Sequence, residues 1–173
     1  PRSGGFDWAD PAWGIQLRLF GWRVASPRYS GTVAEMMSGE GSYLYGGRWN
    51  SKGTRVVYLG GSLSLAAFEL LVHLQRPQVL MSYKNLLVSF EESHVLSVDE
   101  GDLPSDWNKM SVNSPVQYVG DDWVQQSASL ILEVPSAVIL GEKNYLVNVL
   151  HPDYPTLEFG EIEDFRFDPR VLK

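Results

Sequence analysis

The chain contains no cysteine among its 173 residues. This absence excludes disulfide bonds, thiolate metal sites and a cysteine nucleophile, and it is compatible with the cytosol. The sequence also lacks an apolar run of membrane-spanning length. Its first residues show no charged segment followed by an apolar one, so we expect neither a membrane anchor nor a secretory signal.

Positive charge is scarce and unevenly distributed. Residues 1–86 carry 9 Lys and Arg against 5 Asp and Glu, a net charge of +4. Residues 87–173 carry 5 against 16, a net charge of −11, and the whole chain stands at −7. Overall acidity argues against sequence-independent nucleic-acid binding, which depends on many phosphate contacts. The positive half can still hold one small polyanion, and the acidic half is either a solvated face or a docking surface for a basic partner.

The pattern of apolar residues predicts a single globular domain without repeats or linkers. Apolar runs predict strands at 17–24, 56–59, 85–90, 95–98, 130–134, 137–140 and 145–150, with one more in the tail at 158–167. A hairpin is expected through 141–144, helices at about 62–74 and 116–127, one short helix within 26–47, and an irregular connection at 104–115. This distribution is typical of an α+β domain with a partly antiparallel sheet.

A lone carboxylate, Glu69, lies on a helix that is apolar nearly all round. An ionised carboxylate in such a place costs several kcal/mol unless it is paired or faces a wet cleft. One interpretation is that Glu69 and His73, one turn apart, form a narrow solvent-facing stripe. The arginine and tyrosine motifs just upstream favour a functional interpretation instead.

Arg48 follows two glycines, which let backbone amides approach a ligand, and a guanidinium grips phosphate or carboxylate with two parallel bonds. The alternative is an arginine that braces a turn by binding carbonyl groups. Arg23 is a second candidate phosphate clamp, or one partner of a surface ion pair. Tyr58, on a short apolar strand, is either a core residue or an aromatic wall for a planar heterocycle with its hydroxyl available. Trp49 can serve in the same way.

Ser136 follows Pro135 without the Gly-x-Ser-x-Gly motif of hydrolases, so we do not expect a nucleophile there. A hydroxyl at a strand end binds the backbone or orients a site residue. The three histidines, His73, His94 and His151, lack metal-ligand spacing, and we expect no metal.

Together these motifs resemble the RES-domain toxins of bacterial toxin–antitoxin modules, a family named for an arginine, a glutamate and a serine. The matching segments are 39–41, 46–50 with Gly53, 57–59, 67–74, 103–104 with Trp107, 134–137, 144–148 and 151–153. The resemblance covers residues 17 to 170. We therefore assign a RES domain to residues 15–173, with residues 1–14 as an N-terminal extension or an expression remnant. Val149 departs from the pattern, because the family is expected to place a proline there.

The resemblance implies an ADP-ribosyltransferase-like fold related to diphtheria toxin, with a split sheet and flanking helices. It implies a bacterial, cytoplasmic enzyme that depletes NAD by cleaving the bond between nicotinamide and ribose, as a glycohydrolase or phosphorylase. NAD is then the substrate, and no cofactor is expected. The implied protein partner is a cognate antitoxin or immunity protein, with an Xre-type helix-turn-helix antitoxin expected. No contact with nucleic acid or membrane is expected. The oligomeric state stays open, a dimer within a complex included.

The resemblance also implies roles for the candidate residues. Arg48, assisted by Arg23, holds the NAD pyrophosphate, and Tyr58 packs near the nicotinamide ring. Glu69 binds the adjacent ribose and stabilises the cation that forms as nicotinamide leaves. Trp49 lines the NAD site, and Ser136 contacts the ribose or supports another residue. Two alternatives remain: an ADP-ribosyltransferase that modifies a protein, and a non-catalytic module that binds a nucleotide or a partner.

Overall fold

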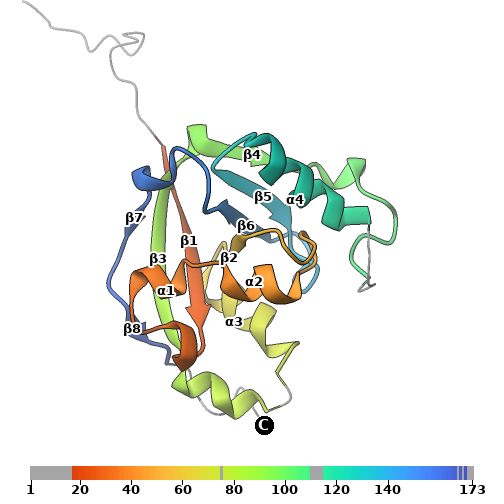
Figure 1. Cartoon of the computed structure of the whole chain (residues 1–173). Helices are drawn as coiled ribbons and strands as arrows, with labels where there is room; N and C mark the ends of the chain where they lie inside the picture. The colour runs from red at the N-terminus through yellow and green to blue at the C-terminus, as the bar shows by residue number, and fades with distance from the viewer. Residues whose placement is uncertain (1–16, 75, 110–114, 167, 169, 171–173) are drawn as a thin grey trace, which may run out of the picture.

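The computed structural model describes residues 17–74, 76–109, 115–166, 168 and 170, and is built around one eight-stranded sheet (Figure 1). Residues 1–14, for which we expect an extension or expression remnant, lie outside the described residues. The strands are β1 (Arg18–Ala25), β2 (Val56–Gly60), β3 (Lys84–Glu91), β4 (Val95–Ser97), β5 (Ile131–Pro135), β6 (Lys143–Asn148), β7 (Glu158–Phe159) and β8 (Glu163–Asp164). The α-helices are α1 (Val33–Met36), α2 (Glu40–Tyr45), α3 (Leu63–Leu71) and α4 (Pro115–Gln126). Short 3-10 turns span Pro27–Tyr29, Pro77–Ser82, Glu92–His94, Glu100–Asp102 and Tyr154–Thr156.

The sheet has the strand order β4-β5-β6-β2-β1-β3-β7, and β8 also pairs with β3. The β4–β5 pair is parallel, and the other pairs are antiparallel. β1 pairs with β3 from Arg18 to Ala25, but it meets β2 at the single pair Trp22↔Gly60. The sheet is therefore continuous, with a narrow junction between β1 and β2. The expected single α+β domain with a partly antiparallel sheet is confirmed.

Two faces of the sheet carry separate helices. On one face, Met36 and Met37 at the end of α1 pack on Val57, Leu59 and the inward residues of β3. On the other face, α3 packs on β1, and α4 covers β5 and β6 together with the segment around Trp49. Because successive strand residues point to opposite faces, β1, β2, β5 and β6 contribute to both layers. The predicted site residues Tyr58 and Glu69 belong to the α3–α4 side.

Most of the predicted elements are present, and the differences have local causes. Helix α3 begins after Ser62, whose hydroxyl accepts a hydrogen bond from the Leu65 amide (3.1 Å), as expected for a cap. The predicted strand at 137–140 is wrong. The Ser136 hydroxyl accepts hydrogen bonds from the amides of Val138 and Ile139 and holds this segment in a turn. The hairpin arms are therefore β5 and β6. Residues 26–47 contain two short α-helices where one was expected.

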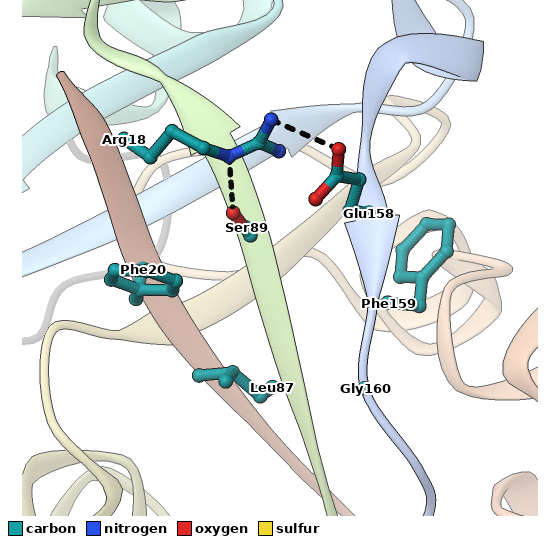
Figure 2. A pocket seen from close by; sticks show the side chains of 7 residues that line it. All are labelled: Arg18, Phe20, Leu87, Ser89, Glu158, Phe159 and Gly160. Atoms are coloured by element: carbon teal, nitrogen blue, oxygen red, sulfur yellow. Dashed lines mark hydrogen bonds and ion pairs between the residues drawn. The ribbon is translucent and has the colours of Figure 1, made fainter. Parts of the chain in front are cut away.

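A hollow of about 330 Å³ lies over β1, β3 and β7 (Figure 2). Arg18 crosses it, donating from Nε to the Ser89 hydroxyl (2.9 Å) and pairing with Glu158 (2.9 Å). Phe20, Leu87, Phe159 and Gly160 complete its lining. None of the predicted site residues lines it, so we treat it as separate from the site described next. In the described part of the chain, no helix is long and apolar enough to cross a membrane.

Candidate active site

The carboxylate of Glu69 is held on one side by two donors. Its Oε1 accepts a hydrogen bond from the Ser136 hydroxyl (2.7 Å) and another from the Asn144 side-chain amide (2.6 Å). Both are short enough to be charge-assisted bonds to an ionised carboxylate. The described residues supply no donor to the other oxygen, Oε2. Glu69 is half-buried, so this oxygen is available to a ligand.

Helix α3 reaches these partners because it lies directly on β2. A Cβ on Gly60 would sit 2.5 Å from the Ala66 backbone nitrogen, so only glycine allows this close approach. Gly60 is also the register partner of Asn144 on β6. The contact between helix and sheet therefore brings Glu69 to Asn144, although 75 residues separate them in the chain.

Ser136 is oriented by the backbone at the base of the β5–β6 hairpin. It is 1% exposed, and its hydroxyl oxygen accepts from the amides of Val138 (3.1 Å) and Ile139 (3.0 Å). With both acceptor positions occupied, its single proton is directed to Glu69. Ser136 therefore does both things that the sequence allowed, since its hydroxyl binds the backbone and also orients the Glu69 carboxylate. This geometry does not place a nucleophile.

Asn144 is the site residue that sequence reasoning missed. It is 8% exposed, and its Oδ1 is buried without a hydrogen-bond partner among the described residues. An orphaned buried acceptor costs about 1–3 kcal/mol. The signal available in the sequence was an asparagine at each end of an apolar run, in the segment Asn144-Tyr145-Leu146-Val147-Asn148.

Asn50 is the centre of the arginine loop, which we define as residues 46–54. It is fully buried, and its amide donates to the carbonyls of Ser42 (3.1 Å), Ser51 (3.0 Å) and Thr54 (3.0 Å). Its Oδ1 accepts from the Tyr58 hydroxyl (2.8 Å). The loop is thus tied to helix α2, to itself and to strand β2.

The Tyr58 hydroxyl is committed to this loop. It donates to Asn50 and accepts from the Trp49 amide (3.1 Å), so the expected free hydroxyl is absent. Burial raises the pKa of Tyr58 above its ordinary value, so the group is a neutral phenol at physiological pH. A Cβ on Gly47 would lie 2.5 Å from this hydroxyl oxygen, which explains a glycine at this position. What Tyr58 can offer a ligand is its ring.

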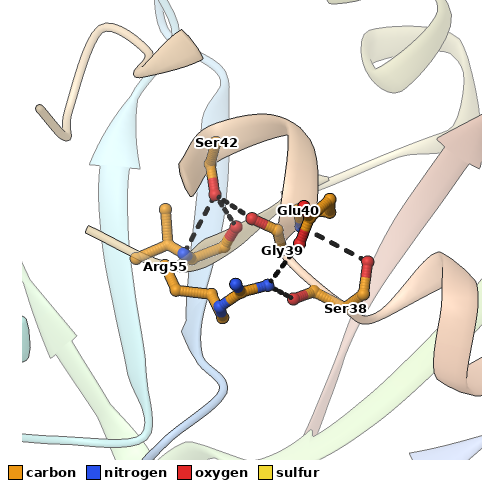
Figure 3. Close-up of polar contacts among 6 residues, drawn as sticks. Ser38, Gly39, Glu40, Ser42 and Arg55 are labelled. Atoms are coloured by element: carbon orange, nitrogen blue, oxygen red, sulfur yellow. Dashed lines mark hydrogen bonds and ion pairs between the residues drawn. The ribbon is translucent and has the colours of Figure 1, made fainter. Parts of the chain in front are cut away.

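Helices support the loop from two sides. On α4, Gln117 donates to the Gly47 carbonyl (2.8 Å), and Asp121 accepts from the Ser51 amide (2.9 Å). On the other side, α2 is fixed to the start of β2 (Figure 3), where Arg55 binds the Ser38 carbonyl and pairs with Glu40, each at 2.9 Å. Ser42 joins these parts, since its hydroxyl contacts the backbone of Val56 and its carbonyl accepts from Asn50. The position of Arg48 is therefore fixed by contacts far from it in sequence.

Arg48 itself both braces the structure and contributes charge to the site. One terminal nitrogen donates to the carbonyls of Trp107 (3.1 Å) and Lys109 (3.2 Å), the bracing role that the sequence left open. Its other two guanidinium nitrogens have no partner among the described residues. Burial lowers the pKa of Arg48, whereas the negative charge of the nearby Glu69 carboxylate acts to raise it. Tyr58 is tied to the residue next to Arg48, because its hydroxyl accepts from the Trp49 amide, and the charge of Glu69 acts on the Arg48 guanidinium.

Arg23 lies on the other face of the sheet. It donates from Nε to the Met36 carbonyl (3.2 Å) and from a terminal nitrogen to the Tyr58 carbonyl (3.4 Å). It thus fills the gap where β1 and β2 separate. Burial lowers its pKa to about 10, and within the described ranges no carboxylate pairs with it. The alternative of a surface ion pair is wrong, and Arg23 is not brought together with Glu69.

Trp49 is a core residue in this structure. Its side chain is 2% exposed and packs against Trp107 with ring centroids 6.0 Å apart. The expectation that its ring lines a ligand site finds no support in this geometry, because a buried indole offers no surface. Within the described residues, no cluster of three or more His, Asp or Glu has the arrangement of a metal site.

Comparison with known proteins agrees with the motifs. A model of the RES domain matches residues 21–168. The chain belongs to the family of RES-domain toxins. Two curated relatives are both named Toxin Res: one from Yersinia enterocolitica, 34% identical over 151 residues, and one from Photorhabdus laumondii, 33% identical over 153. These alignments cover 87% and 88% of this chain and 97% and 96% of the relatives.

This RES-domain chain is also similar to a third curated protein and to a chain in a solved structure. A protein of Sphingobium sp. named Prs ADP-ribosylating toxin is 28% identical over 155 residues, covering 88% of this chain and 96% of the relative. A chain in the crystal structure of the M. tuberculosis MbcT–MbcA toxin–antitoxin complex superposes with a TM-score of 0.69 at 18% identity. That superposition covers 91% of this chain and 88% of the other, and at such low identity it shows a shared fold alone.

Proposed function

We propose that this RES-domain toxin depletes NAD by cleaving the bond between nicotinamide and ribose. The observation that carries the proposal is the carboxylate of Glu69. Its Oε1 is held by Ser136 and Asn144, its Oε2 is open, and Arg48 and Tyr58 share its neighbourhood. A fixed negative group of this kind is what a reaction passing through a sugar cation needs.

In the proposed reaction, the bond between ribose and the pyridinium nitrogen breaks and its electron pair moves to that nitrogen. Nicotinamide leaves as a neutral molecule, and the positive charge passes to the ribose. Glu69 Oε2 accepts a hydrogen bond from a ribose hydroxyl and stabilises the developing cation. Water or phosphate then adds to the ribose carbon, and water loses a proton in doing so. Fixed electrostatic contacts of this type contribute about 10²–10³ in rate in other enzymes.

The other residues take supporting roles in this proposal. Arg48 binds the pyrophosphate through the two guanidinium nitrogens that the protein leaves unused, while its bonds to Trp107 and Lys109 fix its position. Tyr58 packs its ring near the nicotinamide. Ser136 orients Glu69. Arg23 and Trp49 stabilise the sheet junction and the arginine loop and do not contact NAD.

A second candidate is transfer of ADP-ribose to a protein. The name of the Sphingobium relative, an ADP-ribosylating toxin, favours it. Both activities begin with the same bond cleavage and differ in the acceptor. We further propose an ADP-ribosyltransferase-like fold related to diphtheria toxin, a bacterial cytosolic site of action, and a cognate antitoxin or immunity protein. That partner would carry an Xre-type helix-turn-helix and cover the site.

Incubating the purified protein with NAD labelled in its adenylate part tests the proposal. Free ADP-ribose, or ADP-ribose phosphate when phosphate is present, is the expected product, with nicotinamide released in equal amount. Label on a protein band would instead indicate ADP-ribosyl transfer. Unchanged NAD would contradict both activities and leave a non-catalytic binding module.

A further inference from the structure

Asn144 makes one useful side-chain hydrogen bond and leaves its other polar atom unsatisfied. Its amide nitrogen donates to Glu69 Oε1 at 2.6 Å, while its Oδ1 is buried without a partner among the described residues. Rotating the amide by half a turn would bring Oδ1 against the carboxylate, two acceptors facing each other. The contact with Glu69 thus fixes the orientation of Asn144, and the orphaned oxygen is its consequence.

A purely structural role does not explain an asparagine at this position. Asn144 lies on β6 between Gly60 of β2 and Val134 of β5, in a sheet whose neighbouring inward positions are apolar. An apolar side chain there would remove a buried unsatisfied acceptor. Buried polar groups are normally hydrogen-bonded, and the exceptions concentrate at functional sites.

We propose that Asn144 is a positioning residue that decides which oxygen of Glu69 faces the substrate. This inference rests on the proposed NAD cleavage. Ser136 alone gives Glu69 one anchor, about which the carboxylate can still turn. Asn144 supplies a second donor to the same oxygen from a different strand, so the carboxylate plane is fixed and Oε2 points away from both anchors. Precise placement of a catalytic group is worth as much as about 100-fold in rate.

The experiment compares Asn144→Ala and Asn144→Asp with a matched control, Asn85→Ala. Asn85 is also a buried strand asparagine with one side-chain bond, to the Glu163 carbonyl (3.3 Å), but it lies on β3. We expect Asn144→Ala to lower kcat for NAD cleavage about 10- to 100-fold. Its KM should change less than about twofold and its melting temperature should not fall. Asn85→Ala should lose melting temperature and keep kcat.

For Asn144→Asp, the informative measurement is the pH dependence of kcat, which a purely structural role of Asn144 would leave unchanged. It sets a second carboxylate against Glu69 at hydrogen-bond distance, and such a pair must share a proton. We expect its kcat to be highest in mildly acidic buffer, where the shared proton replaces the donor that the amide supplied, and to fall as the pH rises and both carboxylates ionise, a dependence absent from Asn144→Ala. Identical pH profiles for the two variants would overturn the inference.

The outcomes separate this inference from the proposed function. Wild-type protein that cleaves NAD while Asn144→Ala retains its kcat overturns the positioning role alone. A kcat that falls only in proportion to the folded fraction of the variant overturns it as well. If wild-type protein leaves NAD intact, the proposed function fails, and crystal structures of wild type and Asn144→Ala decide the inference. A displaced Glu69 carboxylate in the variant supports it, and an unmoved carboxylate overturns it.

Discussion

The arginine loop and the corner around Glu69 lie in one neighbourhood but treat their polar groups differently. In the loop, the side chain of Asn50 and the Tyr58 hydroxyl use their hydrogen-bonding capacity within the protein. At the corner, Glu69 Oε2 and Asn144 Oδ1 lack partners among the described residues. Saturated networks give rigidity, whereas open polar atoms give chemistry. The loop is therefore the frame of the site, and the corner is its reactive part.

The largest effect on activity is expected from a substitution of Glu69, in the reactive part of the site. Glu69→Gln keeps the size of the side chain and removes its charge, so we expect kcat for NAD cleavage to fall by at least about 10²-fold. The melting temperature should stay close to that of the wild type, because the amide oxygen can still accept from Ser136 and Asn144. Steady-state NAD consumption measures the effect. Near wild-type turnover would show that the charge is not needed.

Breaking the frame should affect stability first. Asn50→Ala removes four side-chain hydrogen bonds from a fully buried place, namely those to three carbonyls and the one from the Tyr58 hydroxyl. We expect a loss of about 3 kcal/mol in the free energy of unfolding, measured with urea. The exposed Asn108 provides the control, since Asn108→Ala should change stability by less than about 0.5 kcal/mol. Equal effects for the two variants would contradict the frame assignment.

Substitutions of the two predicted phosphate clamps, Arg48 and Arg23, are expected to differ in their effect on the KM for NAD. Arg48→Ala should raise the KM for NAD about 10- to 100-fold, the value of a charged hydrogen bond to an anion. Arg23 binds carbonyls on the opposite face, so we expect Arg23→Gln to change the KM less than about threefold. Initial-rate kinetics over a range of NAD concentrations distinguish them. Similar increases in KM would restore Arg23 to the binding site.

Much of the framework was predictable because local signals determined it. The run Val56-Val57-Tyr58-Leu59 between glycines predicted β2, and Ser62 before an apolar run predicted the start of α3. The lone carboxylate on that helix directed attention to Glu69, which accepts hydrogen bonds from Ser136 and Asn144 in the structure. Local patterns failed where a side chain competed with the backbone, as Ser136 does in turning residues 137–140 away from a strand.

The contacts within the site were not predictable from spacing alone. The pairing of Glu69 with Asn144 depends on how closely α3 approaches β2, which depends on Gly60. The burial of Trp49 and the committed hydroxyl of Tyr58 follow from the packing of α4 and from Asn50. The position of Arg23 was not predictable from spacing either, because the face of the sheet on which it lies follows from the register of β1 against β3.

A crystal structure of the Glu69→Gln variant with intact NAD bound tests the central claim most directly. The account predicts that the nicotinamide ribose lies within hydrogen-bond distance of the side chain at position 69, on the side away from Ser136 and Asn144. It also predicts the pyrophosphate against Arg48. A dinucleotide bound elsewhere, for example in the hollow between Phe20 and Phe159, would contradict it.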